Sequence, residues 1–272
     1  MKDTIYSREQ YLRKKAAEKE PLNIQLTNNY AFRKLFKMNY IARGFLIALL
    51  GLDEEDVVKL EVIDPFEEGE NEEEKEGILD IKIYLNDNKK INIEMQNRYQ
   101  EDWTERSLFY NCRMFTDGFY HGQSYGELEP CIHIGILDFN LMRSQGFYHH
   151  IKLLDIKTGE EYNDKLQFHV VQLKKLENAA KEEKEMELYY WAKLLAAKDW
   201  KEVDDTIKGN PYREAAKDEM YKMSQDERER YLYLREEMAY SDEISRMKTA
   251  REEGLEAVSY THLRAHETLA NL

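Results

Sequence analysis

The feature that most constrains the fold is the segment "CIHIGILDF", residues 131–139, which is nearly continuous in apolar side chains and rich in isoleucine. This composition is typical of a strand that is covered on both faces. Around it, hydrophobic periodicity predicts a helix, three strands and a second helix before this strand, then a candidate strand at 168–173 followed only by helices. With 272 residues, 42% of them hydrophobic, the chain can bury one core of ordinary size.

The N-terminal part of the chain is expected to hold an arm and a core helix. Residues 3–20 are charged and helix-prone without a wide apolar stripe, and Pro21 ends them, so we expect a mobile arm. Apolar residues then recur at helical spacing from Asn28, which can cap a helix, to Gly51, which can end one. This segment is predicted to be the first core helix.

Further helices are expected in the middle and at the end of the chain. Residues 101–121 are predicted to form a helix with one apolar and one polar stripe, each stepping by four, three and four residues. The apolar stripe is Leu108, Cys112, Phe115 and Phe119, and the polar stripe is Arg106, Tyr110, Arg113 and Asp117. Later, a helix is expected at about 178–198, and the capping box from Ser224 to Glu227 is expected to open another that runs into the 250s.

Residues 77–98, "GILDIKIYLNDNKKINIEMQNR", are predicted to form two short strands around a polar turn. Strand side chains alternate between faces, and the two apolar sets must reach the same core. These sets are Leu79, Ile81, Ile83 and Leu85 in the first strand and Ile91, Ile93 and Met95 in the second. The opposite face carries Ile78, Asp80, Lys82 and Tyr84 in the first strand and Asn92, Glu94 and Gln96 in the second.

Matching the faces fixes the register of this hairpin. The loop Asn86-Asp87-Asn88 closes it and sets Leu85 opposite Lys89. The turn chemistry agrees, because Asn at the last loop position tolerates the left-handed conformation that such a loop often requires. In this register Asp80 lies directly across from Glu94.

Two directly opposed carboxylates need an explanation, because their Cβ atoms would be about 4.5 to 5.5 Å apart and like charges at that distance destabilise a sheet. A divalent cation would remove the conflict, and oxygen ligands of this kind suit Mg²⁺ or Mn²⁺ better than zinc. Such an ion can polarise a phosphodiester and activate a water. The alternative is a solvated face on which Asp80 and Glu94 are ordinary polar residues. The pairing argues against it, since a solvated face usually sets opposite charges across a hairpin.

Several segments of the chain resemble the PD-(D/E)XK nuclease superfamily, and specifically its Rpn family of recombination-promoting nucleases and transposases. They are "TNNYAFRKLF" at 27–36, "KEGILDIKIYLNDNKKINIEMQNR" at 75–98, "ERSLFYNCRMF" at 105–115 and "GELEPCIHIGILDF" at 126–139. The resemblance covers roughly residues 22–175. It implies a restriction-endonuclease-like α/β fold, a mixed sheet flanked by helices, and metal-dependent cleavage of DNA at carboxylates on the second and third core strands.

The resemblance also implies roles for individual residues. Asp80 corresponds to the metal-binding Asp, Glu94 to the second acid, and Gln96 to the position where many relatives carry the catalytic Lys. A neutral Gln96 can orient the attacking water or the phosphate but cannot stabilise charge as Lys would, although Glu-x-Gln is frequent in this branch. Asn29 stands where relatives often have Asp in the first helix, so one outer carboxylate is missing.

Four more residues are expected to contact the substrate: Lys82, Arg106, Tyr110 and Arg113. Lys82 shares a face with Asp80, and the other three lie on the polar stripe of the helix that follows the hairpin, where Arg suits phosphate. The alternative interpretation of this stripe is a solvated helix face. Trp103 could stack on a base, but the 19 tyrosines spread over the chain are more simply explained by packing.

The chain is therefore expected to have four parts. Residues 1–21 form the charged arm, 22–175 the nuclease-like domain and 176–257 a helical extension. Residues 258–272, "VSYTHLRAHETLANL", resemble translated sequencing-adapter or vector sequence and are expected to be a non-native tail.

Charge and composition limit the partners and the location. Forty basic against 54 acidic residues give a net charge of -14, which argues against a protein that coats nucleic acid by charge alone. Cys112 and Cys131 lack metal-ligand spacing and are interpreted as reduced core residues of a cytoplasmic protein. The longest apolar run, "FLIALL" at 45–50, is too short to span a bilayer.

The histidines suggest two alternative metal sites, and neither is favoured. A metal site built from His133, His149, His150 and His169 is not favoured, because adjacent histidines in an irregular segment rarely share one ion. His262 and His266 have the spacing of a helical zinc pair, but the Glu is in the wrong place for the metalloprotease pattern.

Two functions are consistent with these observations. The first is a DNA endonuclease that uses Mg²⁺ or Mn²⁺ to hydrolyse phosphodiester bonds, linked by the resemblance to recombination or mobile elements. The second is a catalytically inactive nuclease fold that acts as an interaction scaffold through its C-terminal helices. A homodimer fits either function.

Overall fold

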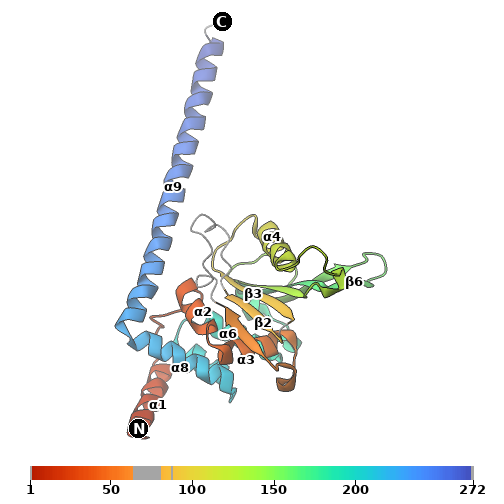
Figure 1. Ribbon diagram of the computed structural model, residues 1–272. Helices are drawn as coiled ribbons and strands as arrows, with labels where there is room; N and C mark the ends of the chain where they lie inside the picture. The colour runs from red at the N-terminus through yellow and green to blue at the C-terminus, as the bar shows by residue number, and fades with distance from the viewer. Residues whose placement is uncertain (1, 64–80, 87, 271–272) are drawn as a thin grey trace.

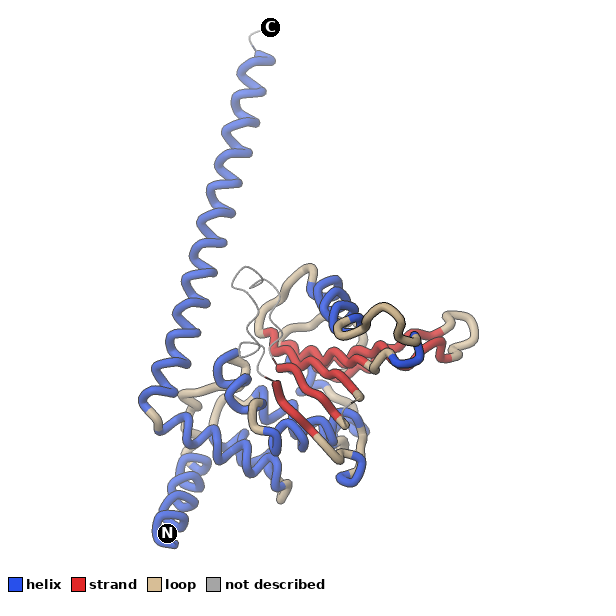
Figure 2. The backbone as a smooth tube through the Cα atoms, viewed as in Figure 1, coloured by secondary structure: helices blue, strands red, loops and turns tan. Residues whose placement is uncertain are grey.

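The computed structural model describes residues 2–63, 81–86 and 88–270, and these form one mixed sheet flanked by helices (Figures 1 and 2). The described strands are β1 (Leu60–Ile63), β2 (Ile81–Leu85), β3 (Lys89–Gln96), β4 (Cys131–Leu137), β5 (Tyr148–Leu154) and β6 (Glu161–Gln172). Their order is β1-β2-β3-β4-β6-β5. β3, β4 and β6 run parallel, and the remaining pairs are antiparallel. The predicted mixed α/β sheet is confirmed.

The hairpin of β2 and β3 has the predicted register. Leu85 pairs with Lys89 and Ile81 with Ile93, and every described apolar side chain of the core-facing set is buried. One detail differs, because the left-handed residue is Asn86, with φ of 54°, and not Asn88. The Asn86 Oδ1 atom accepts hydrogen bonds from the backbone N–H groups of Val58 and Lys59. The first loop residue therefore ties the hairpin to the segment before β1.

The core-facing side of the sheet packs against α2 (Asn29–Phe36), α3 (Asn39–Leu50) and α6 (Glu187–Ala196). The single helix predicted from Asn28 to Gly51 is in fact two helices, α2 and α3, because Met38 is extended. Apolar spacing continues across this break, so periodicity could not reveal it. The predicted ends are right: the Asn28 side chain caps α2, and Gly51 is left-handed, with φ of 65°.

The other side of the sheet is covered by α4 (Trp103–Thr116) (Figure 1). Here the predicted orientation was wrong. α4 buries Trp103, Ser107, Asn111 and Met114, whereas 49% of Leu108 is exposed and Cys112 is also exposed. The helix has this orientation because the sheet face beneath it is polar. Small and polar side chains of the helix pack against such a face better than the apolar stripe does. Cys131 is a core residue as predicted, but Cys112 is not.

β5 was not predicted, and β6 is longer than the predicted strand at 168–173. The two strands form a hairpin that extends away from the rest of the sheet (Figure 1). Most side chains of β5 and of the first half of β6 are exposed, so neither segment has a hydrophobic pattern that a reader of the sequence could detect.

The N-terminal segment packs on the body of the protein. α1 (Lys2–Ala17) lies against α7 (Trp200–Ile207), with Leu12 and Ala16 buried and Arg8 2.6 Å from Asp218 of α8 (Pro211–Gln225). This packing differs from the mobile arm that we expected. The two buried apolar residues lie one turn apart and form only a narrow stripe. In a segment this rich in charge, such a stripe does not stand out from the sequence.

The chain after β6 is helical, as predicted, but it is divided more finely. In addition to α6, α7 and α8 it contains η4 (Leu173–Asn178), α5 (Lys181–Lys184) and α9 (Glu227–Ala270). Two shorter 3₁₀ helices lie earlier in the chain, η1 (Glu54–Asp56) and η3 (Tyr125–Glu127). Asp226 caps α9 by accepting a 2.9 Å hydrogen bond from the Glu229 N–H. The predicted cap Ser224 instead ends α8, and its hydroxyl donates to the Tyr221 carbonyl.

α9 runs beyond the predicted 250s and extends away from the sheet (Figure 1). Its last turns include residues of the predicted non-native tail, and the side chains of His262 and His266 lie outside the described ones. Among the described helices, none is both long enough and apolar enough to cross a membrane.

Candidate functional site

The sheet face beneath α4 carries a buried carboxylate, Glu94 of β3. Strand alternation sets Glu94 on this face with Asn92 and Gln96, and only 6% of the Glu94 side chain is exposed. Arg106 of α4 reaches it: Nη2 of Arg106 donates a 2.8 Å hydrogen bond to Oε1 of Glu94, and Nη1 donates to Gln100. A buried carboxylate requires such a partner, because an unpaired charge in the interior is costly.

Trp103, at the start of α4, determines the position of Arg106. Its buried indole lies over Gly135 of β4, and Gly135 is the residue that pairs with Glu94 across the sheet. A Cβ atom on Gly135 would overlap the indole, so the glycine is what allows α4 to begin this close to the sheet. One helical turn later, Arg106 is within reach of Glu94.

His133 of β4 lies beside the carboxylate in the same buried layer. Its Nε2 atom is 3.7 Å from Oε2 of Glu94, and Asn92 donates a 3.1 Å hydrogen bond to its Nδ1. Burial, with a further contribution from the Arg106 charge, lowers the pKa of His133 to about 3. The imidazole is therefore neutral, and since Nδ1 accepts from Asn92, Nε2 carries the proton and faces Glu94.

Glu94 opens onto a cleft of about 290 Å³ at the carboxyl end of β3. The cleft is lined by Asn29, Glu94, Met95, Gln96, Asn97, Arg98, Tyr99, Gln100, Arg106, Tyr240, Glu243 and Met247. Both Gln96 and Asn29 are therefore at the site, and the Asn29 Oδ1 atom is buried without a hydrogen-bond partner in the described part of the chain. The lining is rich in oxygen and guanidinium groups, which suits a charged ligand.

The last three lining residues belong to α9, which sequence reasoning did not connect to the site. Tyr30 of α2 donates a 2.6 Å hydrogen bond to Glu229, and Asn28 donates a 2.7 Å bond to Glu237, so α9 is fixed beside α2. Arg98 then donates a 3.0 Å hydrogen bond to the carbonyl of Tyr240. Arg98 and Tyr240 are far apart in the sequence, so no local sequence pattern could reveal their contact.

A family model described as a PD-(D/E)XK nuclease family transposase matches residues 26–250. The chain belongs to this family. No curated protein and no solved structure matches it. Membership confirms the resemblance seen in the sequence and supports a nuclease or mobile-element role. Nucleases of the PD-(D/E)XK family act on DNA and typically use divalent metal ions, but the family also includes degenerate members.

Of the three residues predicted from the PD-(D/E)XK resemblance, the structure describes two. Asp80 lies outside the described residues, and the described register runs up to Ile81 opposite Ile93. Glu94 and Gln96 lie together in the cleft. Their oxygens are hard donors that suit Mg²⁺ or Mn²⁺. The described residues contain no group of three or more His, Cys, Asp or Glu side chains arranged to hold a metal.

Of the predicted substrate contacts, only Arg106 lines the cleft. Lys82 is 3.7 Å from Asp117, beyond the far end of α4. Tyr110 lies beside Arg106, whose guanidinium carbon is 5.5 Å from the Tyr110 ring centre, and Arg113 is on the exposed side of α4. The structure therefore does not bring Lys82 or Arg113 to Glu94.

The four histidines of the less favoured metal site do not gather into one group of ligands among the described residues. His150 stacks on His169, with ring centres 4.2 Å apart, and His149 bonds Gln172, while His133 lies beneath α4. Nδ1 of His169 is bonded by the Tyr148 hydroxyl at 2.7 Å. These contacts give the histidines packing and hydrogen-bonding roles.

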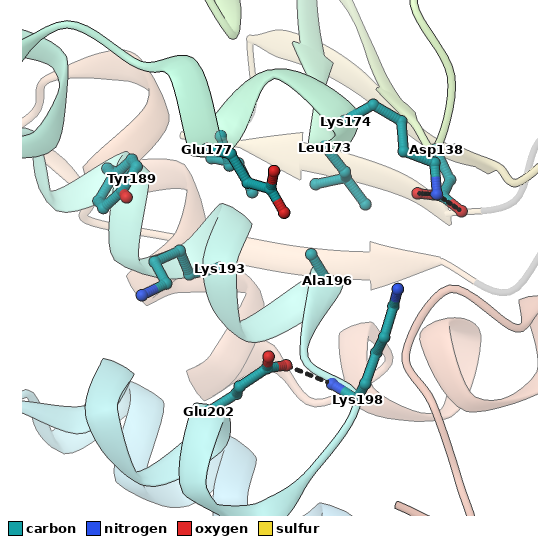
Figure 3. Close-up of a pocket in the computed structure, with 10 residues that line it drawn as sticks. Asp138, Leu173, Lys174, Glu177, Tyr189, Lys193, Ala196, Lys198 and Glu202 are labelled. Atoms are coloured by element: carbon teal, nitrogen blue, oxygen red, sulfur yellow. Dashed lines mark hydrogen bonds and ion pairs between the residues drawn. The ribbon is translucent and has the colours of Figure 1, made fainter.

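A larger cavity, of about 490 Å³, lies next to the site at the carboxyl ends of the parallel strands (Figure 3). The two are close, because the Asp138 N–H donates a 2.9 Å hydrogen bond to the Gln96 carbonyl. Three lysines and three carboxylates line this cavity: Lys174, Lys193, Lys198, Asp138, Glu177 and Glu202. Asp138 pairs with Lys174 at 3.0 Å. Since these charges balance and none comes from β3, we place the candidate active site in the smaller cleft.

Proposed function

We propose that the chain is a DNA endonuclease that depends on Mg²⁺ or Mn²⁺, hydrolyses phosphodiester bonds, and acts in DNA recombination or in the movement of mobile elements. The observation that carries the proposal is Glu94, a buried carboxylate that opens onto a cleft and that the sequence resemblance aligns with the second acid of these nucleases. Burying a carboxylate is costly, and a metal ion bound at this edge of the cleft would, like Arg106, offset its charge.

In this proposal Asp80 and Glu94 hold the metal ion, which when bound would polarise the phosphodiester and lower the pKa of a bound water. Gln96 orients the attacking water or a phosphate oxygen through its amide. Arg106 balances the charge of Glu94 in the free protein and, with 34% of its side chain exposed, can also bind a phosphate oxygen of the substrate. Lys82, Tyr110 and Arg113 remain proposals as outer contacts for longer DNA. A cytoplasmic location is proposed as well.

The second candidate is a scaffold that keeps the fold without cleavage. Two observations favour it. Gln96 lacks the positive charge of the usual Lys, and α9 exposes Tyr231, Leu234 and Met238, apolar residues at helical spacing that suit helix-mediated self-association. A homodimer is proposed in either case.

Nicking of supercoiled plasmid DNA in Mg²⁺ and in EDTA tests the first proposal. The scaffold predicts a plasmid that stays intact in both Mg²⁺ and EDTA, together with self-association of the protein, which light scattering of the protein alone measures. Cleavage that is equally fast in EDTA would rule out metal dependence.

A further inference from the structure

The cleft contains an exposed aromatic ring, Tyr99. It lies three residues after Gln96, and 64% of it is exposed, whereas the other aromatic residue of the cleft, Tyr240, is partly covered by Arg98. A single exposed ring on a protein surface is common and means little by itself. What distinguishes Tyr99 is its support and its neighbours.

Phe139 supports the Tyr99 ring from below. The two ring centres are 5.5 Å apart at an interplanar angle of 83°, which is the edge-to-face arrangement that aromatic pairs prefer. Phe139 is itself buried in a small cluster with Trp103, Leu137 and Val170. The exposed ring is therefore held in place, and a ring that is already ordered loses little conformational entropy when a ligand stacks on it.

The neighbours of Tyr99 supply the other groups that a nucleotide needs. Arg106 lines the same cleft and can bind a phosphate, and the Glu94 carboxylate lies 2.8 Å from its guanidinium. A carboxylate, a guanidinium and a supported aromatic ring therefore share one cleft. This set matches the scissile phosphate of one nucleotide and a base beside it.

The size of the cleft restricts the state of that base. Its volume of about 290 Å³ is small, and α9 forms part of its wall through Tyr240, Glu243 and Met247. A base can lie on Tyr99 in this space only when it has left the stack of a duplex, as bases do in enzymes that act on unpaired or extruded nucleotides.

We propose that Tyr99 is a base-stacking residue and that the substrate is DNA with an unpaired nucleotide next to the bond that is cut. The assignment of the cut bond rests on the proposed nuclease function, but the stacking itself does not. Aromatic stacking tolerates any base, so the preference is for strand state and not for sequence.

Binding to the full chain, measured in EDTA so that no DNA is cut, tests the proposal. Fluorescence anisotropy compares a labelled single-stranded oligonucleotide with the duplex of the same sequence. The wild-type protein should bind the single strand more tightly, and Tyr99→Ala should weaken that binding by about 5- to 100-fold, while Tyr99→Phe, which keeps the ring, stays close to wild type. Tyr162→Ala is the matched control, because Tyr162 of β6 is 84% exposed and lines no described cavity.

Three results would overturn the proposal: unchanged binding by Tyr99→Ala, an equal loss in Tyr162→Ala, or a wild-type protein that prefers duplex or binds neither DNA. A parallel nicking assay in Mg²⁺ separates this failure from that of the proposed function. Nicking without Tyr99-dependent binding overturns the stacking role alone. Tyr99-dependent binding of the single strand without any cleavage supports the stacking role and contradicts the nuclease.

Discussion

Arg106 of α4 and Glu94 of β3 form a buried ion pair, with Nη2 2.8 Å from Oε1, that joins the helix to the strand at the floor of the cleft. The carboxylate is almost fully buried, whereas the guanidinium is about one-third exposed. Glu94 is thus charge-balanced by a group that also remains partly accessible to solvent. The pair links the stability of the fold to the chemistry of the site.

Arg106→Ala is expected to destabilise the protein by about 1–3 kcal/mol, because it leaves the buried Glu94 carboxylate without this partner. The partial exposure of Arg106 keeps the effect below that of a fully buried pair. Urea unfolding measures the change. Arg106→Lys should lose less, and the exposed Arg143→Ala should lose little. A loss no larger in Arg106→Ala than in Arg143→Ala would contradict the role of the pair.

Gly135→Ala should lower the free energy of unfolding by about 1–3 kcal/mol, since the added methyl group overlaps the Trp103 indole and a well-packed site must shift to accept it. Thermal and urea unfolding both report this. Gly126→Ala is the control, because its nearest neighbour would be Ser124 Oγ at 3.6 Å, an ordinary contact. Trp103→Phe added to Gly135→Ala should recover part of the loss, and the absence of recovery would show that another contact is responsible.

Gln96→Lys should raise the nicking rate by about tenfold, because a charged donor makes a hydrogen bond to a phosphate roughly twice as strong as a neutral one. Gln96→Met, of similar size but without a polar end, should lower the rate. Initial rates on supercoiled plasmid give both values. If Gln96→Lys is no faster than wild type, the amide is not a weaker substitute for the lysine of other family members.

The pH dependence of stability should reflect both buried histidines with a lowered pKa, His133 and His169. His169 is the one to test, because it contacts Tyr148 and His150, away from Glu94, and is influenced by the charges of Lys152 and Lys89. Burial, helped by His150 and the two lysines, lowers its pKa to about 3 in the folded protein, from an ordinary value of 6.5. The unfolded chain therefore binds more protons between these values, and stability present above pH 6.5 is lost as the pH falls toward 3.

This loss should reach about 1–2 kcal/mol for His169 between pH 7.5 and 5. Urea unfolding at both pH values should show a correspondingly smaller loss in His169→Gln. His121→Gln, at an exposed residue, should keep the wild-type dependence. An identical pH dependence in His169→Gln and wild type would exclude a contribution from His169.

The parts of the fold that follow from local alternation could be predicted from sequence. Ile81, Ile83, Ile91 and Ile93 had to share one core, which fixed the β2–β3 register and the side on which Glu94 lies. The orientation of α4 could not be predicted, because it depends on what the sheet presents to the helix. A polar layer of Asn92, Glu94 and His133 receives Ser107 and Asn111, so the apolar stripe with Leu108 faces outward.

The candidate site, too, could be predicted only where it depends on local sequence. Glu94 and Gln96 are neighbours in sequence and follow from the hairpin. The wall contributed by Tyr240 and Glu243 is set by contacts of α9 with α2 and Arg98, which join residues more than a hundred positions apart. β5 and the first half of β6 were missed for another reason: most of their side chains are exposed and show no apolar pattern.

The central claim, a metal-dependent nuclease site at Asp80 and Glu94, is tested most directly by nicking of supercoiled plasmid in Mg²⁺ by wild type, Asp80→Ala and Glu94→Ala. Circular dichroism of each variant checks that the fold is kept, and EDTA provides the metal-free control. The account predicts nicking by the wild-type protein that EDTA abolishes and that falls about 100-fold or more in each variant. Wild-type protein no more active than the two folded variants would contradict it.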